Sequence, residues 1–201
     1  MSVHAIKDAI LSVPIQQGRR IIAISGPPAS GKSTLAEELQ AEIHRSCVLP
    51  MDGFHYSNED LEGAGILARK GAPETFDVTR FEAILQAVRT TSTVSFSTFD
   101  RSRDCVVPGG GIVNANDHTI LVEGNYLLLD AAPWSRLLSL WDYTIMLDVP
   151  AATLEARLVQ RWLDHGHNVA DAQERVRSND LPNALYTQRH SVKADQVISH
   201  H

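Results

Sequence analysis

The 201-residue sequence predicts an α/β fold, with a mainly parallel sheet between two layers of helices. Two observations lead to this prediction. Short apolar runs of strand length alternate along the chain with longer stretches whose apolar residues recur at helical spacing. The runs are apolar at nearly every position rather than at every second one, which is typical of strands buried on both faces of a parallel sheet.

The first hundred residues alternate between expected helices and strands. Val3, Ile6 and Ile10 recur at helical spacing and Pro14 ends the pattern, which predicts a short leading helix. Each later strand is a compact apolar run, and each later helix has its apolar residues on one face. In order, the expected elements are a strand over residues 21–25, a glycine loop and helix from residue 26, a strand over 47–51, a polar segment over 55–75, a helix from about residue 77 and a strand over 94–99.

The second hundred residues continue the pattern and add a small hairpin. Residues 105–114, CVVPGGGIVN, have β-type arms on both sides of a Pro-Gly-rich turn, which predicts a hairpin within this segment. Two further buried strands are expected over residues 119–124 and 143–149, each followed by a helix punctuated by proline. The terminal DQVIS, residues 195–199, is expected to form the last strand.

Composition and charge limit the classes of protein that fit. Hydrophobic residues make up 43% of the chain and charged residues 21%, as in an ordinary globular protein, and we expect one domain over residues 1–201. The net charge is -6 without a basic stripe, so nucleic acid is not an expected partner. No apolar run has the length of a membrane span or a signal peptide. Cys47 and Cys105 are too few for a disulfide framework, so a reducing cytoplasm is expected.

A phosphate-binding loop is predicted at residues 26–33, where GPPASGKS fits the pattern G-x-x-x-x-G-K-[ST] between an expected strand and an expected helix. Glycines let the backbone curl so that N–H groups point at phosphate oxygens, and the helix dipole acts at the same place. Lys32 is expected to reach the β- and γ-phosphates, and Ser33 to offer its hydroxyl to Mg²⁺. The residues expected to bind the nucleotide are Gly26, Ala29, Ser30, Gly31, Lys32, Ser33 and Thr34.

A carboxylate stands at the carboxyl end of the second expected strand. Asp52 precedes Gly53, which permits a sharp exit, and ligands of open α/β sheets bind outside the carboxyl ends of the strands. A hydroxyl group that attacks the γ-phosphorus needs a base, so Asp52 is the candidate general base, with a turn or capping role as the alternative. His55 and Tyr56 are candidates for contact with the substrate, and the alternative is a solvated loop.

Three more charged residues complete the candidate site. Glu123 ends the strand over 119–124, and because packing alone rarely places Glu there, we expect it to hold Mg²⁺ or its water. Arg157 and Arg161 lie four residues apart on one helical face. Two guanidinium groups there are able to close over a triphosphate and to offset the charge on the γ-phosphoryl group in the transition state. The alternative is an ordinary solvated helix surface.

The segment after the third strand is rich in charge, with two cations and two anions among residues 99–104. Such a cluster is able to hold a polar substrate, and Phe99, Asp100, Arg101 and Arg103 are therefore candidate substrate-binding residues. Surface ion pairs, which contribute little to stability, are an equally open alternative.

In these segments the chain resembles the P-loop kinase family that contains uridine kinase, phosphoribulokinase and type I pantothenate kinase. The family's motifs appear in the family's order as GPPASGKST, MDGFH, RKGAPETFDV, FDRSRD and LVEGNYLLL, and cover most of residues 20–165. The resemblance implies a P-loop NTPase fold with a helical lid over about residues 151–180 and a small hairpin on the substrate side. It places the family's catalytic Asp on Asp52, its metal-side acid on Glu123 and its lid arginines on Arg157 and Arg161.

Within this family the chain is similar to compact bacterial kinases labelled as sugar-transport-associated or fructose kinases. After the third strand it reads Phe99-Asp100-Arg101, where pantothenate kinases typically have Tyr-x-His. A sugar or polyol acceptor suits this charged segment, because carboxylates and guanidinium groups hydrogen-bond hydroxyls well.

The sequence thus predicts a kinase that transfers the γ-phosphoryl group of Mg-ATP to a hydroxyl of a small metabolite such as a sugar, a pantothenate-like compound or a nucleoside. The alternative is an NTP hydrolase or a regulatory nucleotide-binding module, and Asp52 beside a substrate-like loop favours the kinase. The acceptor, the choice of ATP over GTP and the oligomeric state, a homodimer included, stay open.

Overall fold

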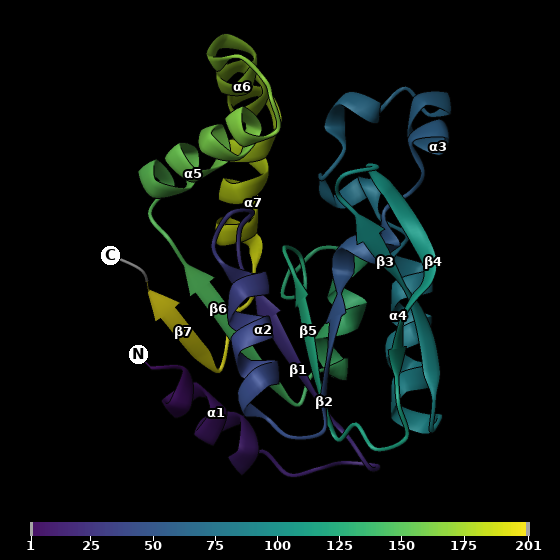
Figure 1. Ribbon diagram of the computed structural model, residues 1–201. Coiled ribbons are helices and arrows are strands. Elements are labelled where there is room, and N and C mark those ends of the chain that lie inside the picture. Colours follow the sequence, from purple (N-terminus) through teal and green to yellow (C-terminus); the bar gives the residue numbers. More distant parts are fainter. Residues whose placement is uncertain (1, 200–201) are drawn as a thin grey trace.

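A computed structural model describes residues 2–199, and its centre is a five-stranded parallel sheet (Figure 1). The strand order is β2-β5-β1-β6-β7. β1 (Arg20–Ser25) and β5 (Thr119–Gly124) are buried at every residue, as expected of central strands whose two faces are both covered. β2 (Ser46–Pro50), β6 (Tyr143–Asp148) and β7 (Gln196–Ser199) complete the sheet. The predicted parallel sheet is therefore confirmed, and five of the six expected strands form it.

Two helices cover one face of the sheet. α1 (Val3–Ser12) and α2 (Lys32–Glu42) pack against the side chains of Ile22 and Ile24 from β1, whereas Ile21 belongs to the cluster on the opposite face. This alternation follows from the two-residue period of a strand. Burial on both faces explains why the strands read as continuous apolar runs in the sequence.

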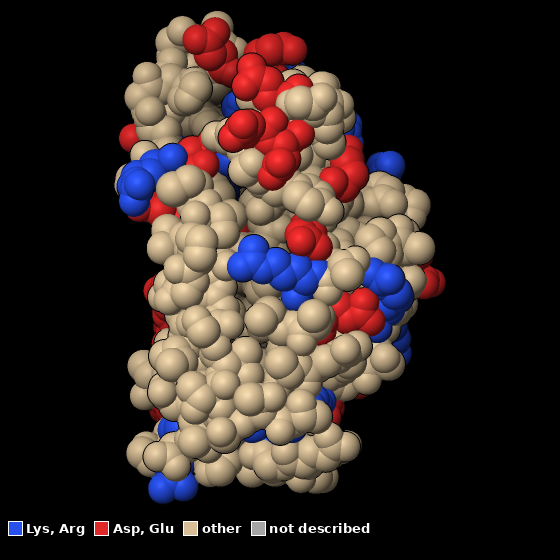
Figure 2. Space-filling model, turned by 90° about the vertical axis from the view of Figure 1, so that its right-hand side faces the viewer, with Lys and Arg blue, Asp and Glu red and all other residues tan. Residues whose placement is uncertain are grey.

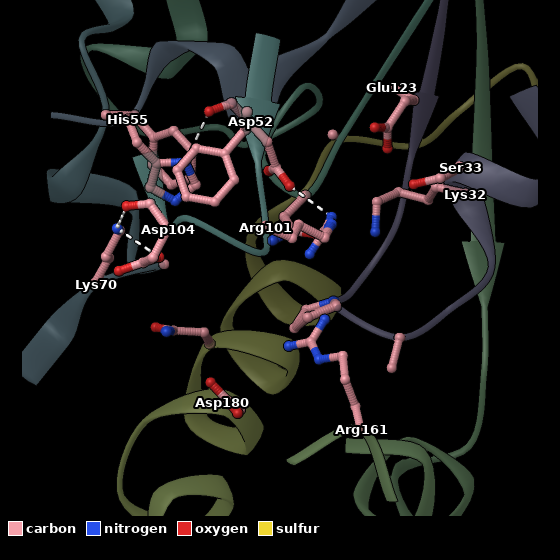
Figure 3. A pocket seen from close by; sticks show the side chains of 18 of the residues that line it. Lys32, Ser33, Asp52, His55, Lys70, Arg101, Asp104, Glu123, Arg161 and Asp180 are labelled. Atoms are coloured by element: carbon pink, nitrogen blue, oxygen red, sulfur yellow. Dashed lines mark hydrogen bonds and ion pairs between the residues drawn. The ribbon is translucent and has the colours of Figure 1, made fainter. Parts of the chain in front are cut away.

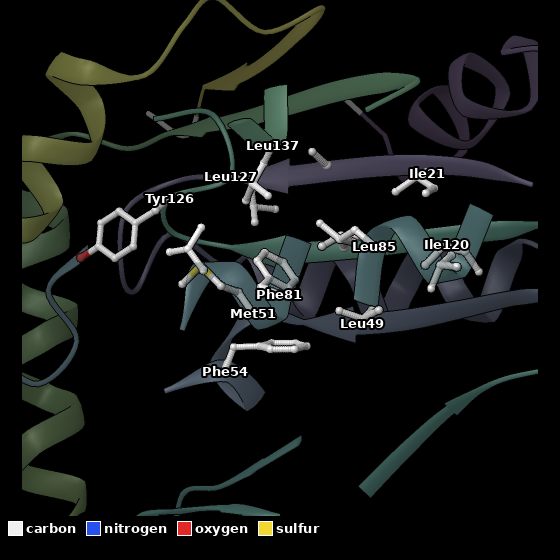
Figure 4. Close-up of a cluster of buried hydrophobic side chains, with 14 of the residues drawn as sticks. Ile21, Leu49, Met51, Phe54, Phe81, Leu85, Ile120, Tyr126, Leu127 and Leu137 are labelled. Carbon is white, nitrogen blue, oxygen red and sulfur yellow. The ribbon is translucent and has the colours of Figure 1, made fainter. Parts of the chain in front are cut away.

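The opposite face carries a larger core, which Figure 4 shows from close by. α4 (Val78–Thr90) buries Phe81 and Leu85 there. The segment after β5 was predicted as a helix punctuated by proline, and it forms a 3-10 helix over Trp134–Leu140 directly after Pro133. Together these layers give the predicted α/β/α arrangement.

β3 (Val94–Asp100) and β4 (Cys105–Val113) lie outside the parallel sheet and form their own antiparallel pair. The prediction of a hairpin inside residues 105–114 is wrong, because this segment is one strand paired with β3. The reason is steric. A Cβ atom on Gly111 would lie 2.3 Å from the Phe96 ring, so this glycine makes room for the partner strand rather than for a turn.

The polar segment 55–75 holds short helical turns instead of a long loop. α3 (Asn58–Gly63) begins with a capping box formed by Ser57 and Asp60, as is typical of a helix start. Two 3-10 turns follow, over Leu67–Arg69 and Pro73–Thr75. Figure 2 shows the right-hand side of the view in Figure 1, and acidic side chains gather there toward the end of the molecule that carries α3. The sequence of α3, NEDLEG, contains three acidic residues.

The segment after β6 contains the predicted lid, over about residues 151–180, and we refer to its helices as the lid helices. α5 (Ala151–Asp164) is followed by α6 (Val169–Arg175), a π-helical turn over Val176–Asp180 and α7 (Leu181–His190). The π turn ends two residues before Pro182, whose ring and missing N–H disfavour a regular α-helix in this stretch. Within the described residues, no helix combines the length and the apolar character needed to span a membrane.

Candidate active site

A cleft of about 480 Å³ opens where the carboxyl ends of β1, β2 and β5 face the lid helices (Figure 3). Its walls come from five parts of the chain, one of which is the end of β5 with Glu123, Gly124 and Asn125. The other four are the loop after β1, the turn after β2 with the segment near residue 70, the β3–β4 turn, and the lid. This is the edge of the sheet at which ligands of open α/β folds bind.

The loop between β1 and α2 has the backbone geometry of an anion cradle. Ala29 and Gly31 adopt positive φ angles of 64° and 96°. A Cβ atom on Gly26 would lie 3.0 Å from the Leu147 carbonyl oxygen, so the close approach requires glycine. In the described part of the chain no side chain caps α2, and the Ser30 hydroxyl is buried without a hydrogen-bond partner. The first N–H groups of α2 are therefore available to an anion.

Lys32 is the first residue of α2 and is only 7% exposed. Its Nζ atom donates a hydrogen bond to the Pro27 carbonyl oxygen at 2.9 Å, across the loop. Burial lowers the pKa of Lys32 to about 8, although the nearby carboxylates of Glu123 and Asp52 act in the opposite direction. A buried ammonium group at the mouth of this loop is well placed to gain from a bound phosphate.

Glu123 lies at the end of β5 and is also 7% exposed. Burial and then the charge of Asp52 raise the pKa of Glu123 to about 7, against the effects of Lys32, Arg101 and a hydrogen bond from Ser33. Figure 3 shows Lys32, Ser33 and Glu123 on the same side of the cleft. The hydroxyl and the carboxylate predicted to hold the metal are therefore adjacent.

Asp52 lies in a 3-10 turn, Met51–Phe54, that directly follows β2. Its Oδ2 atom accepts a hydrogen bond from Arg101 Nη2 at 2.7 Å, which brings the β3–β4 turn onto the carboxylate. Gly53 is needed here for close packing, because a Cβ atom on it would lie 1.8 Å from the Ser97 carbonyl oxygen.

His55 lines the same cleft and is held on two sides. Its Nδ1 atom donates to the Asp52 carbonyl oxygen at 2.9 Å, since a carbonyl only accepts. Its ring packs against Phe76 and Phe99, with centroids 4.0 and 5.0 Å apart. Burial lowers the pKa of His55, so the neutral ring is favoured, with Nε2 free to accept a hydrogen bond.

The two lid arginines lie in different places. Arg161 lines the cleft, and its pKa is lowered chiefly by burial. Arg157 stands outside the lining and donates a hydrogen bond from Nη1 to the Ala29 carbonyl oxygen at 3.2 Å. One arginine thus faces the cleft while the other fastens α5 to the phosphate loop.

Three predicted substrate residues are not part of the cleft lining: Tyr56, Asp100 and Arg103. The Asp100 carboxylate accepts hydrogen bonds from the backbone of Ser102 and Arg103, at 2.9 and 3.1 Å, and so closes the β3–β4 turn. Any contact of these three side chains with a substrate stays a prediction.

The cleft also includes residues that sequence reasoning missed. Lys70 and Asp104 belong to the segments RKGAPETFDV and FDRSRD, but no local pattern indicates that their side chains meet. The missed cleft residues from the lid helices match no sequence motif, because ordinary residues on a helix form no pattern that indicates a site. The missed lining residues are Pro28, Lys70, Gly71, Phe76, Asp104, Gly124, Asn125, Trp162, Arg175, Asp180 and Asn183.

Comparison with curated proteins finds relatives over nearly the whole chain. The uncharacterized protein YggC of Escherichia coli (strain K12) is 32% identical over 196 residues, covering 94% of this chain and 81% of that protein. A Schizosaccharomyces pombe protein named as a candidate uridine kinase, C227.14, is 32% identical over 90% of this chain and 83% of its own. A pantothenate kinase of Lactococcus lactis subsp. cremoris (strain MG1363) is 29% identical over 71% of this chain and 47% of its own. No protein-family model matches.

Solved structures agree with these relatives. A crystal structure described as a candidate fructose transport system kinase from Silicibacter sp. TM1040 has a TM-score of 0.95 and 44% identity, covering 98% of this chain and 99% of that one. Phosphoribulokinase from Rhodobacter spheroides has a TM-score of 0.58 at 15% identity, over 88% of this chain and 66% of its own, and shares the fold.

The parallel sheet, the phosphate loop with its buried lysine, and the facing lid together define a P-loop small-molecule kinase. The chain belongs to the family of such kinases that contains uridine kinase, phosphoribulokinase and pantothenate kinase.

Proposed function

We propose that the protein transfers the γ-phosphoryl group of ATP to a hydroxyl group of a small metabolite, with Asp52 as the general base. The observation that carries the proposal is the position of the Asp52 carboxylate. It lies in one cleft with Lys32 and Arg161 and is fixed by the 2.7 Å contact with Arg101. The names of relatives, which refer to uridine, pantothenate and fructose, support an alcohol group as the acceptor.

The residues present fit Mg-ATP. In the described part of the chain α2 has no side-chain cap and the buried Arg175 Nε atom has no hydrogen-bond partner, and both Arg161 and Arg175 line the cleft. These groups supply donors and positive charge for a triphosphate. Ser33 and Glu123 would hold Mg²⁺, which when bound neutralises charge on the β- and γ-phosphate oxygens.

In the transfer step, the acceptor hydroxyl gives its proton to Asp52 as its oxygen forms a bond to the γ-phosphorus. The bond from the γ-phosphorus to the bridging β,γ-oxygen breaks, and ADP leaves with the electron pair of that bond. Lys32 and Arg161 stabilise the charge that develops on the transferred group. The cleft walls orient the acceptor and reduce competition from water.

A dependence of ADP release on an acceptor distinguishes the proposed kinase from an NTP hydrolase. ADP release should be measured with Mg-ATP alone and then with sugars, polyols, nucleosides and pantothenate. We expect slow release alone and at least about tenfold stimulation by one of these compounds, since a bound acceptor replaces water at the γ-phosphorus. Lys32→Met should abolish both rates, which controls for a contaminating ATPase. Fast release that no compound changes would support the hydrolase.

A further inference from the structure

Lys70 forms a closed set of contacts on the acceptor side of the cleft. Its Nζ atom lies 2.8 Å from Asp104 Oδ1, 2.6 Å from Asn58 Oδ1 and 3.2 Å from the Asp104 carbonyl oxygen. An ammonium group has three donors, and these three contacts use all of them. The Lys70 side chain is only 10% exposed, so its charge is compensated inside the protein by Asp104.

The Asp104 carboxylate, in contrast, keeps room for a ligand. Lys70 and Asn58 each use one lone pair, the latter through Asn58 Nδ2 at 2.9 Å from Oδ2. A carboxylate offers about four acceptor sites, and the Asp104 side chain is 58% exposed. The free acceptor sites therefore face the solvent side of the cleft.

Two other groups that line the cleft, His55 near Asp52 and Asp180 in the lid, also accept hydrogen bonds. His55 has its proton on Nδ1, which leaves Nε2 as an acceptor. Asp180 accepts one hydrogen bond, from Trp162 Nε1 at 2.6 Å, and its second oxygen is an acceptor as well. These acceptors favour a ligand rich in donors. Hydroxyl groups provide donors, whereas a carboxylate or a phosphate does not.

We propose that the Lys70–Asp104 pair determines the specificity for the acceptor, a proposal that rests on the proposed function. The pair favours uncharged, hydroxyl-rich acceptors and excludes hydroxy acids and phosphate esters. An acidic acceptor would place an anion beside Asp104 while Lys70 has no donor left to pair with it. The acidic residues of α3, which adjoin Asn58, oppose an anion at the same end of the cleft.

The test compares neutral and acidic acceptors that share their hydroxyl groups: glycerol with glycerate, pantothenol with pantothenate, and ribulose with ribulose 5-phosphate. Acceptor-dependent ADP release gives kcat/KM for each member. In wild-type protein we expect the neutral member of any pair that is used to be favoured at least about tenfold, because like charges and unpaired anions are rejected. A wild-type preference for the acidic member would overturn the inference and leave the kinase intact. Release that no member stimulates, nor any sugar or nucleoside, would remove the proposed function itself.

Two variants test whether the pair itself sets the preference. Asp104→Asn leaves the Lys70 charge uncompensated, so the ratio of kcat/KM should move toward the acidic member by about tenfold. Lys70→Gln leaves Asp104 unpaired and should move the ratio the other way. Glu74→Gln, which breaks the Arg69–Glu74 ion pair in the same segment, is the matched control and should leave the ratio unchanged. Equal losses for both members in Asp104→Asn and Lys70→Gln would show a merely structural role and overturn the inference.

Discussion

Glu123 is a buried carboxylate, and its protonation is linked to the stability of the fold. An unfolded Glu loses its proton near pH 4.5, whereas in the folded protein burial raises the pKa of Glu123 to about 7. Between these pH values the folded state binds the extra proton. The free energy of unfolding therefore falls as pH rises from about 4.5 to about 7. Lys32, whose pKa is lowered to about 8, stays protonated in both states over this window.

Replacing Glu123 should remove this pH dependence. In Glu123→Gln the loss of stability between pH 4.5 and 7, on the order of 3 kcal/mol for a shift of this size, should disappear. Denaturant unfolding of the nucleotide-free protein at pH 5 and pH 7.5 measures it. Glu37→Gln, on the exposed face of α2, should keep the full wild-type dependence. Identical pH dependence in wild type and Glu123→Gln would contradict the buried, protonated state.

Among single residues, the sequence predicts those whose role follows from their position in a helix, strand or loop. Lys32 follows from a motif, and Asp52 and Glu123 follow from their places at strand ends. Lys70 and Asp104 do not follow, because their contact joins residues 34 positions apart through a turn whose geometry no local pattern specifies.

The helix α5 presents its two arginines to different surroundings, so their variants should behave differently. Arg161→Ala removes a cation that lines the cleft, and kcat should fall by roughly a hundredfold with a smaller change in KM for ATP. Arg157→Ala removes the hydrogen bond to Ala29 and should act mainly on KM for ATP, because it loosens the phosphate loop. Steady-state kinetics with a saturating acceptor measures both, and equal losses of kcat would contradict the assignment.

Among the elements, β4 shows where a sequence pattern misleads. Proline and three glycines in CVVPGGGIV are typical of a turn, and so the segment was predicted as a hairpin. The strand pairing that prevails is set by Phe96 on β3, whose ring lies against Gly111. A glycine that makes space for a partner and a glycine that makes a turn look the same in a single sequence.

Across the whole molecule, the lid touches both sides of the cleft. Arg157 donates to Ala29 on the phosphate loop, and Asn179 of the π turn donates to the Lys70 carbonyl oxygen at 3.0 Å. The parallel sheet could be predicted because each strand carries its own apolar signal. The position of the lid helices over the cleft could not be predicted, since it depends on a few polar contacts between segments more than a hundred residues apart.

The most direct test of the account is single-turnover transfer of labelled γ-phosphoryl from ATP to the best acceptor by Asp52→Asn. The variant keeps the shape of the side chain and cannot take the proton, so the transfer rate should fall by roughly 10² to 10⁴. Nucleotide affinity should stay within about twofold, because the phosphates are held by the loop and α2. Asp8→Asn is the matched control, because Asp8 is exposed and α1 lies at the opposite end of the molecule from the lid helices (Figure 1). Transfer by Asp52→Asn at the wild-type rate would contradict the assignment of Asp52 as the base.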